Sequence, residues 1–318
     1  MKCLVTGCAG FIGSHLCDSL LAQGYQVVGV DAFTPYYAPS LKQDNLTAAN
    51  RHPRFQLIRA DLNQVNLDGL LEGVDIIFHL AGQPGVRKSW GTQFTAYATN
   101  NILATERLLH ACVGRSLQRF VYASSSSIYG DAPDLPWRED TRPRPRSPYA
   151  ITKLAAEHLC RAYWLDFDVP TVALRYFTVY GPRQRPDMAF HRFIRAILAG
   201  RPLTLFGDGT QTRDFTYVDD IVTGTIAAAT AENVVGKVFN LGGGSRISLN
   251  DLLEILQEVV GKTIMIERHA RQAGDVRHTW ADTRLATRYL GFAPQVTLRD
   301  GLAREYAWLQ KLVGAGDR

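Results

Sequence analysis

The sequence predicts an α/β fold in which a doubly wound parallel sheet is followed by a smaller C-terminal α/β lobe. Three observations support this fold class. Short apolar runs alternate with helical periodicity over the first two-thirds of the 318 residues, which is typical of repeated strand-helix-strand units. Runs such as IIF at 76–78 are apolar on successive residues, as expected for strands buried on both faces. After about residue 176 the segments become shorter and are interrupted by Pro and Gly.

The main sheet is expected to take six strands from the first part of the chain, at 2–7, 26–31, 55–61, 74–82, 119–125 and 171–177. Helical periodicity between them predicts helices near 11–23, 92–113 and 148–167, and later helices near 187–199 and 249–260. The buried pattern at 238–244 predicts a return to the main sheet. The predicted domains are therefore 1–176, with a chain return near 214–244, and 177–318, which mainly forms the smaller lobe.

Composition excludes several classes of protein. The net charge is +5, but the basic residues are spread along the chain and build no patch for nucleic acid. The eight histidines lack metal-binding spacing, so no metal site is expected. Five scattered cysteines fit a reducing cytosol, which predicts a cytoplasmic protein. No apolar run reaches the roughly 20 residues of a membrane span, and a glycine motif stands where a signal peptide would lie, so the mature chain is expected to start near Met1.

A glycine-rich turn follows the first predicted strand. The segment TGCAGFIGSHL places Gly7, Gly10 and Gly13 between that strand and a helix, with Phe11 and Ile12 between the last two glycines. Glycines at these positions allow a tight turn, a close approach of backbone to a pyrophosphate, and packing of helix on strand. The phosphates would then lie at the positive helix N-terminus. The turn predicts a dinucleotide site.

Acidic and apolar residues at later strand ends extend this predicted site. Asp31 follows Gly13 by 18 residues at the end of the second strand, where a carboxylate accepts hydrogen bonds from ribose hydroxyls and repels a 2′-phosphate, which favours NAD over NADP. His79 lies within an apolar strand and is predicted to be a core histidine. The other strand-end residues predicted to contact the cofactor are Asp61, Leu62, Leu80, Ala81 and Gln83.

Tyr149 and Lys153 form the one YxxxK motif of the sequence, on the helix predicted to follow a strand that ends in four serines. The i, i+4 spacing places both side chains on one helix face. A tyrosine serves as a base near neutrality only if its pKa falls by about 3 units, or about 4 kcal/mol. The Lys153 ammonium and a positively charged nicotinamide are two sources of that stabilisation. The alternative is a surface pair without chemistry.

Five segments together carry a resemblance to a known family: TGCAGFIGSHL, SSSSIYG, PYAITK, RYFTVYGP and QTRDFTYVDDIV. In this order they resemble the nucleotide-sugar epimerases and dehydratases of the extended short-chain dehydrogenase/reductase superfamily. The resemblance implies a Rossmann-type sheet with tightly held NAD, a smaller substrate lobe, and a homodimer built on a four-helix bundle. It makes Ser125, Tyr149 and Lys153 the catalytic residues, and it adds Lys42 and Tyr176 to the cofactor site.

The serine run separates the reactions of that family. Its 4,6-dehydratases carry an Asp-Glu pair in this segment and its decarboxylases carry a Glu, whereas this chain has Ser125, Ser126 and Ser127. Elimination and decarboxylation therefore lose support, and 4-epimerisation through a transient 4-keto sugar remains. In that reaction Ser125 would bond the C4 oxygen. Ser124 is expected to end the strand without a chemical role.

The segment FTVYGP followed by RPDM is similar to the UDP-glucuronate 4-epimerases of the same family. The similarity implies interconversion of UDP-glucuronate and UDP-galacturonate, with the sugar carboxylate held by Ser126, Ser127 and Thr178 and with Arg185 close by. Hydroxyls would supply donors without a fixed ion pair that opposes rotation of the 4-keto sugar. A 4-epimerase of neutral UDP-hexoses and a catalytically silent NAD-binding sensor remain alternatives.

The resemblance also implies contacts to the rest of the substrate. Arg213 matches the arginine that meets the diphosphate, Leu205 and Phe206 are expected near the uracil, and Asp275 near the uridine ribose. Gln272 stands where galactose epimerases have Arg, which agrees with the glucuronate subfamily. Arg277 is a further phosphate ligand in this interpretation. Pro84, Arg87 and Arg192 complete the predicted substrate set, although the two arginines fit surface charges equally well.

Overall fold

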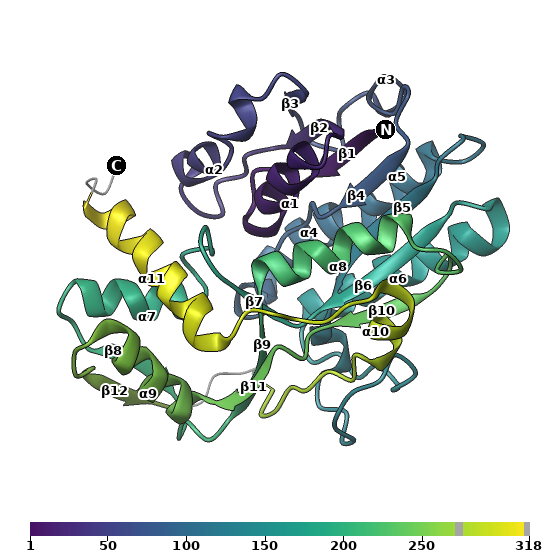
Figure 1. Ribbon diagram of the computed structural model, residues 1–318. Coiled ribbons are helices and arrows are strands. Elements are labelled where there is room, and N and C mark those ends of the chain that lie inside the picture. The colour runs from purple at the N-terminus through teal and green to yellow at the C-terminus, as the bar shows by residue number, and fades with distance from the viewer. Residues whose placement is uncertain (271–275, 315–318) are drawn as a thin grey trace.

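The main sheet of the protein is parallel and seven-stranded, with the order β3-β2-β1-β4-β5-β6-β10 (Figure 1). It comes from a computed structural model that describes residues 1–270 and 276–314. Its strands are β1 (Lys2–Thr6), β2 (Gln26–Asp31), β3 (Phe55–Arg59), β4 (Ile76–His79), β5 (Arg119–Ser125), β6 (Thr171–Tyr176) and β10 (Val238–Leu241). Each predicted strand of the main sheet is present, some of them shorter by a few residues.

Helices cover both faces of this sheet. Alternate residues of the strands point to opposite faces, so that Cys3 and Val5 of β1 pack with α1 (Phe11–Ala22) and α8 (Val218–Thr230). Leu4 of the same strand packs instead with α3 (Leu67–Leu70), α5 (Ala104–Ala111) and α6 (Pro148–Phe167). Figure 1 shows α1 and α8 side by side across one face, in agreement with their direct contact. The sheet is doubly wound, as the sequence predicted.

The predicted helix at 92–113 is interrupted. The structure divides it into η3 (Gly91–Gln93), α4 (Phe94–Tyr97), a π-helical segment η4 (Ala98–Leu103) and α5. Apolar periodicity did not locate the π-turn, which accommodates about one extra residue in a single turn of the helix. Such turns occur frequently at functional sites. Here the turn contains the buried Asn101, whose side chain leaves the helix toward the candidate site.

The smaller lobe lies beyond the carboxyl ends of the main strands (Figure 1). Its apolar side chains belong to the same hydrophobic core as one face of the main sheet. A three-stranded sheet, β11-β9-β7, leads into it, and a pair of strands, β12 and β8, lies under its helices. Its elements are β7 (Thr178–Tyr180), α7 (Ala189–Leu198), β8 (Leu203–Phe206), β9 (Thr212–Tyr217), β11 (Ser245–Ser248), α9 (Leu249–Val260), β12 (Ile266–His269) and α11 (Leu298–Gly314).

The remaining elements are short connections. They are α2 (Pro39–Asn45), η1 (Ala49–Arg51), η2 (Arg87–Ser89), η5 (Ser126–Tyr129) and α10 (Arg284–Leu290). Over the described residues, no helix combines the length and hydropathy that crossing a membrane requires. The same residues contain no group of three or more His, Cys, Asp or Glu side chains arranged to hold a metal ion.

Candidate functional site

A cavity opens at the carboxyl ends of β1, β2, β4 and β5, where open parallel sheets bind their ligands. Every residue predicted to contact the cofactor lines it: Gly7, Gly10, Phe11, Ile12, Gly13, Asp31, Lys42, Asp61, Leu62, Leu80, Ala81, Gln83, Tyr149, Lys153 and Tyr176. Among the predicted substrate residues, Pro84, Tyr149 and Arg185 line the same cavity. The fold therefore collects strand-end residues from 7 to 176 in one place.

Glycine is required at two positions of the turn after β1. Gly7 has a φ of +71°, and a Cβ there would lie 2.8 Å from the amide nitrogen of Ala81. Gly13 packs so tightly that a Cβ would fall on the carbonyl oxygen of Gly7. Gly10 is the N-cap of α1 and supplies no side-chain cap, so the first amide groups of α1 are left for a ligand at the cavity wall.

Asp31 ends β2 with its carboxylate buried among donors. Oδ2 accepts from the amide of Ala9 at 3.2 Å, and Oδ1 accepts from the amide of Phe33 at 2.7 Å. The Lys42 ammonium lies 3.4 Å from Oδ1 and is itself buried. The two residues predicted separately for the cofactor site are thus an ion pair at its wall.

Replacing Asp31 with Asn is expected to weaken discrimination between NAD and NADP. The variant keeps an acceptor oxygen but removes the negative charge, which leaves the buried Lys42 ammonium without its counter-charge beside the ribose position. The ratio of NADP to NAD dissociation constants should fall by about tenfold, or about 1.4 kcal/mol. Isothermal titration with both dinucleotides measures this ratio. A ratio equal to that of the wild type would contradict the assignment of Asp31.

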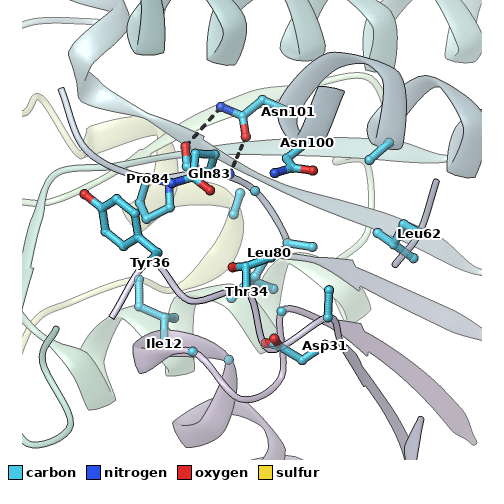
Figure 2. A pocket seen from close by; sticks show the side chains of 18 of the residues that line it. Ile12, Asp31, Thr34, Tyr36, Leu62, Leu80, Gln83, Pro84, Asn100 and Asn101 are labelled. Atoms are coloured by element: carbon cyan, nitrogen blue, oxygen red, sulfur yellow. Dashed lines mark hydrogen bonds between the residues drawn. The ribbon is translucent and has the colours of Figure 1, made fainter. Parts of the chain in front are cut away.

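The loop after β4 is held by side chains from the interrupted helix (Figure 2). Asn101 Oδ1 accepts from the Gln83 amide at 2.6 Å, and Asn101 Nδ2 donates to the Gln83 carbonyl at 3.2 Å and to Thr152 Oγ1 at 2.9 Å. The Tyr97 hydroxyl donates to the carbonyl oxygen of Pro84 at 2.8 Å. These bonds fix the wall of the cavity between β4 and α6.

His79 is a core histidine, as predicted. It is fully buried in β4, and its ring nitrogens lie 2.7 Å from Thr6 Oγ1 and 2.9 Å from Thr105 Oγ1. Burial, reinforced by the charge of Lys153, lowers the His79 pKa to about 3. The ring is therefore neutral near pH 7 and holds β4 to its neighbours.

Tyr149 and Lys153 lie on α6, one turn apart, and both line the cavity. Burial raises the pKa of Tyr149, while a hydrogen bond with Ser125 and the charge of Arg185 lower it. The Lys153 ammonium instead lies 4.4 Å from the centroid of the Tyr122 ring. The expected lowering of the tyrosine pKa by Lys153 is not found: burial outweighs the opposing influence of Ser125 and Arg185, so the Tyr149 pKa lies above its ordinary value.

The four serines have different surroundings. Ser124 donates to Glu157 at 2.6 Å and points into the protein. Ser125 ends β5, and its hydroxyl accepts from the Ser127 amide at 3.2 Å and donates to the Ser127 hydroxyl at 3.1 Å. Ser126 and Ser127 are half-buried in η5. Ser125 therefore lies between Tyr149 and the Ser127 hydroxyl.

Arg185 reaches the cavity next to Tyr149 with one edge already occupied. Its Nε and Nη2 each donate to Asp187 at 3.0 Å, and Asp187 also accepts from the Tyr36 hydroxyl at 3.3 Å. This leaves Arg185 as a nearby positive charge rather than a two-pronged ligand along that edge. Thr178 is half-buried at the start of β7.

Phe206 lies between two arginines from distant parts of the chain. The Arg87 guanidinium is 4.7 Å from the centroid of this ring, and the Arg192 guanidinium is 5.9 Å from it. Both arginines thus lie at the residue predicted to be near the uracil. Leu205, its neighbour in β8, points the other way and is buried in the core.

Arg213 and Arg277 lie together at the start of β9. Arg213 Nη1 donates to the carbonyl oxygens of Thr212 at 2.9 Å and of Arg277 at 3.1 Å. Arg277 is exposed and lies 3.8 Å from Asp208. Asp275, predicted near the uridine ribose, and Gln272 lie outside the described residues.

Sequence reasoning missed several polar residues at this cavity. Tyr36, Asn100 and Asn101 line it and are labelled in Figure 2, and Thr34 and Asn63 complete its polar wall. No motif points to them individually. The available signals were a polar pair, Asn100 and Asn101, within an otherwise periodic helix, and the aromatic pair Tyr36 and Tyr37 after the second strand.

The wall of this cavity fits NAD. Glycines at the turn, an uncapped helix start, a strand-end carboxylate and the apolar side chain of Leu62 match the pyrophosphate, ribose and adenine parts of a dinucleotide. Tyr149 and Lys153 lie at the other end of the same wall. The residues present therefore suit this cofactor.

Comparisons with known proteins agree with this geometry. The profile of the family described as "NAD dependent epimerase/dehydratase family" matches residues 3–242. A Bacillus subtilis (strain 168) relative, "Uncharacterized UDP-glucose epimerase YtcB", is 47% identical over 98% of this chain and 99% of its own length. The UDP-glucuronate 4-epimerase of Thermodesulfobacterium geofontis (strain OPF15) is 39% identical over 96% of this chain and 95% of its own.

A solved structure extends the likeness to three dimensions. The UDP-glucuronic acid 4-epimerase from Bacillus cereus, in complex with UDP-glucuronic acid and NAD, superposes with a TM-score of 0.96 at 48% identity. The match covers 98% of this chain and all of the other. Sequence profile, relatives and structure agree: the chain belongs to the NAD-dependent epimerase/dehydratase family.

Proposed function

We propose that this protein is an NAD-dependent 4-epimerase that interconverts UDP-glucuronate and UDP-galacturonate through a transient 4-keto sugar. The observation that carries the proposal is the junction of Ser125 with Tyr149 at the end of β5, where the following residues offer hydroxyls and no carboxylate. The similarity to the UDP-glucuronate 4-epimerases from Thermodesulfobacterium geofontis and Bacillus cereus supports the choice of sugar.

Tyr149 is the proton-transfer group of this proposal. Bound NAD would supply hydride transfer at C4 of the sugar in both directions, and the cavity wall from Gly7 to Tyr176 would hold it. Tyr149 takes the C4 hydroxyl proton and gives it back, and Ser125 holds the same oxygen by a hydrogen bond. Because burial holds the Tyr149 pKa above its ordinary value, the positive charge of a bound nicotinamide would have to add to the hydrogen bond with Ser125 and the charge of Arg185 to lower it.

The sugar carboxylate is proposed to lie among Ser126, Ser127 and Thr178. Hydroxyl groups satisfy a carboxylate without the strong, directional ion pair that would oppose rotation of the 4-keto sugar. Arg185 would add a positive charge nearby while Asp187 occupies Nε and Nη2. The site would thus attract an acidic sugar and still let it turn.

The smaller lobe is proposed to hold the nucleotide. Arg213 and Arg277 would meet the diphosphate, and Phe206 with Arg87 and Arg192 would lie at the uracil. Residues 1–176 with the return near 214–244 would form the NAD-binding domain, and 177–318 would mainly form this lobe. The contact between Arg87 and Phe206 would join the NAD-binding domain to the smaller lobe.

We also propose a homodimer that acts in the cytoplasm. Phe94, Leu103 and Ile151 are exposed apolar residues on α4, η4 and α6, which are adjacent segments. Two helices from each subunit would bury these side chains in a four-helix bundle. The cytoplasmic location rests on the five cysteines, all of which are unpaired.

Two alternatives predict different products. A neutral-sugar 4-epimerase is suggested by the name of the Bacillus subtilis relative, which mentions UDP-glucose. A silent NAD-binding sensor would turn over neither sugar. Tyr149 and Lys153 line the cavity and Ser125 is hydrogen-bonded to Tyr149, which argues against the sensor.

The test is to incubate the purified protein with UDP-glucuronate or with UDP-glucose and to follow the products by NMR. UDP-glucuronate is expected to give UDP-galacturonate as the main product. Its turnover should be at least about tenfold faster than that of UDP-glucose, because only the acidic sugar has a carboxylate to bind Ser126, Ser127 and Thr178. Faster turnover of UDP-glucose would favour the first alternative. Absence of turnover with normal NAD content would favour the sensor.

A further inference from the structure

Behind the proposed catalytic residues lies a buried ion pair that their chemistry does not use. Glu157, on α6, and Arg175, on β6, are each 5% exposed. Arg175 Nη2 donates to Glu157 Oε1 at 2.6 Å, and Arg175 Nε lies 3.3 Å from Oε1 and 3.2 Å from Oε2. Oε2 also accepts from the Ser124 hydroxyl at 2.6 Å. The carboxylate therefore joins β5, α6 and β6 directly behind the cavity.

The same pair extends into the next segments. Arg175 Nη1 donates to the Tyr129 hydroxyl at 2.7 Å and to the Glu139 carbonyl at 2.9 Å. Tyr129 in turn donates to Asn240 in β10 at 2.7 Å. Every segment that carries a proposed catalytic group is thus held by Glu157 directly or through Arg175.

Stability alone does not account for such a pair. Replacing a buried ion pair with apolar side chains of similar volume is often neutral or stabilising, because desolvation of the two charges offsets their attraction. The position of Glu157 suggests a further role. It follows Lys153 by four residues on the same helix and therefore faces the same side.

Lys153 is a buried cation that needs support. Its ammonium is 7% exposed and lies over the Tyr122 ring. Burial lowers its pKa to about 8, against the opposing influence of Cys160 and Glu157. The Cys160 thiol stays neutral because burial raises its pKa. Glu157 is then the carboxylate that raises the Lys153 pKa and so favours the protonated form of this lysine.

The other titratable groups on elements packed against this part of α6 offer no substitute. Burial lowers the pKa of His79 and raises that of Tyr122, so both are neutral near pH 7. Glu106 on α5 accepts from Tyr163, about three turns along α6 from Lys153. The remaining titratable groups on these elements and on residues 148–158 of α6 are neutral tyrosines, cations and histidines: Tyr97, Tyr129, Tyr149, Tyr176, Arg107, Arg119, Arg175, His110 and His158. Arg185, in the loop before α7, is a further cation near Tyr149.

We propose that Glu157 is a positioning residue for the catalytic residues: its carboxylate fixes the end of β5 through Ser124 and supplies the counter-charge to the buried Lys153 ammonium. Lys153 lines the cavity that fits NAD, so the charge of this ammonium should govern how firmly the cofactor is held. The inference rests on the NAD part of the proposed function and does not depend on which sugar is turned over.

The test uses the Glu157→Gln variant, which keeps hydrogen-bonding atoms and removes the charge. NAD release from the purified full-length holoenzyme is measured by equilibrium dialysis between about pH 6 and 10. In the wild type the affinity should fall as Lys153 loses its proton, near pH 8. In the variant the fall should begin about one pH unit lower, because loss of an opposite charge lowers a lysine pKa. At pH 8 the NAD dissociation constant should rise about fivefold, as the protonated fraction drops from about one half to about one tenth.

Four further variants separate this role from a structural one. Lys153→Met should abolish the pH dependence, which assigns it to this residue. Glu157→Asp should restore the wild-type profile, and Glu106→Gln, a carboxylate change on α5, should leave it unmoved. If Glu157→Gln fails to fold, Glu157→Gln combined with Arg175→Gln removes both charges; because loss of the Arg175 cation opposes loss of the Glu157 carboxylate, the shift should again be downward but smaller. A wild-type profile in either folded variant, or a wild type without an alkaline fall, would overturn the proposal.

Discussion

Replacing Tyr149 with Phe is expected to stop sugar turnover while NAD stays bound. The change removes the hydroxyl that exchanges a proton with C4 and keeps the ring, which packs edge-on against Tyr97 with centroids 6.2 Å apart. General acid-base catalysis contributes about 10²–10⁴-fold, and a water molecule is a poor substitute in a buried site. We therefore expect turnover of UDP-glucuronate, measured by NMR, to fall at least about a thousandfold, or about 4 kcal/mol.

The matched control for this variant is Tyr163→Phe on the same helix. The Tyr163 hydroxyl donates to Glu106 at 2.7 Å and belongs to the packing of α6 on α5. This variant should keep turnover within about threefold of the wild type, with a small loss of stability for the missing hydrogen bond. NAD content is measured spectroscopically in both. Turnover above about a tenth of the wild-type rate in Tyr149→Phe would mean that another group is the base.

The cofactor wall was predictable because its determinants are local in sequence. The turn at Gly7, Gly10 and Gly13 is recognised by glycines at fixed spacing along the sequence. Tyr149 and Lys153 are four residues apart, so any helix through this segment places both side chains on one face. The strands could be read from apolar runs. Parallel topology then brings all strand ends to one edge of the sheet, so residues from 7 to 176 could be assigned to one cavity without coordinates.

Contacts across the two lobes were not predictable in the same way. The pairing of Arg185 with Asp187 and Tyr36 joins segments 151 residues apart, and the position of two arginines at Phe206 depends on how the smaller lobe packs. Periodicity carries no information on such distances. The tyrosine pKa illustrates the consequence, because Arg185 affects it from another segment while the neighbouring Lys153 faces Tyr122.

Helix α8 shows a second limit of pattern reading. It was not among the predicted helices, although it covers one face of the sheet. Most of its residues are buried, so a polar stripe that would reveal a 3.6-residue period is nearly absent. Gly224 and β-branched residues also lower its helix propensity. Gly224 is needed for packing, since a Cβ there would lie 2.7 Å from Phe292.

Replacing Gly13 with Ala is expected to abolish stable NAD binding. Within a helix this change usually stabilises by up to about 1 kcal/mol. Here the sign reverses, because the added Cβ would fall on the carbonyl oxygen of Gly7 and lie 3.1 Å from the Cα of Cys8. Both neighbours are backbone, so α1 must move away from the turn after β1. That movement displaces the amide groups of α1 that line the cavity.

We expect the NAD dissociation constant of Gly13→Ala to rise about a hundredfold, or about 3 kcal/mol, in isothermal titration, with a lower melting temperature. Gly69→Ala is the matched control. Gly69 lies in α3, where the nearest neighbour of an added Cβ is the end of the Asn66 side chain at 3.8 Å. This control should bind NAD as the wild type does and melt at the same temperature or slightly higher. Unchanged NAD affinity in Gly13→Ala would show that the turn after β1 is not the phosphate site, because the substitution must displace the backbone of that turn.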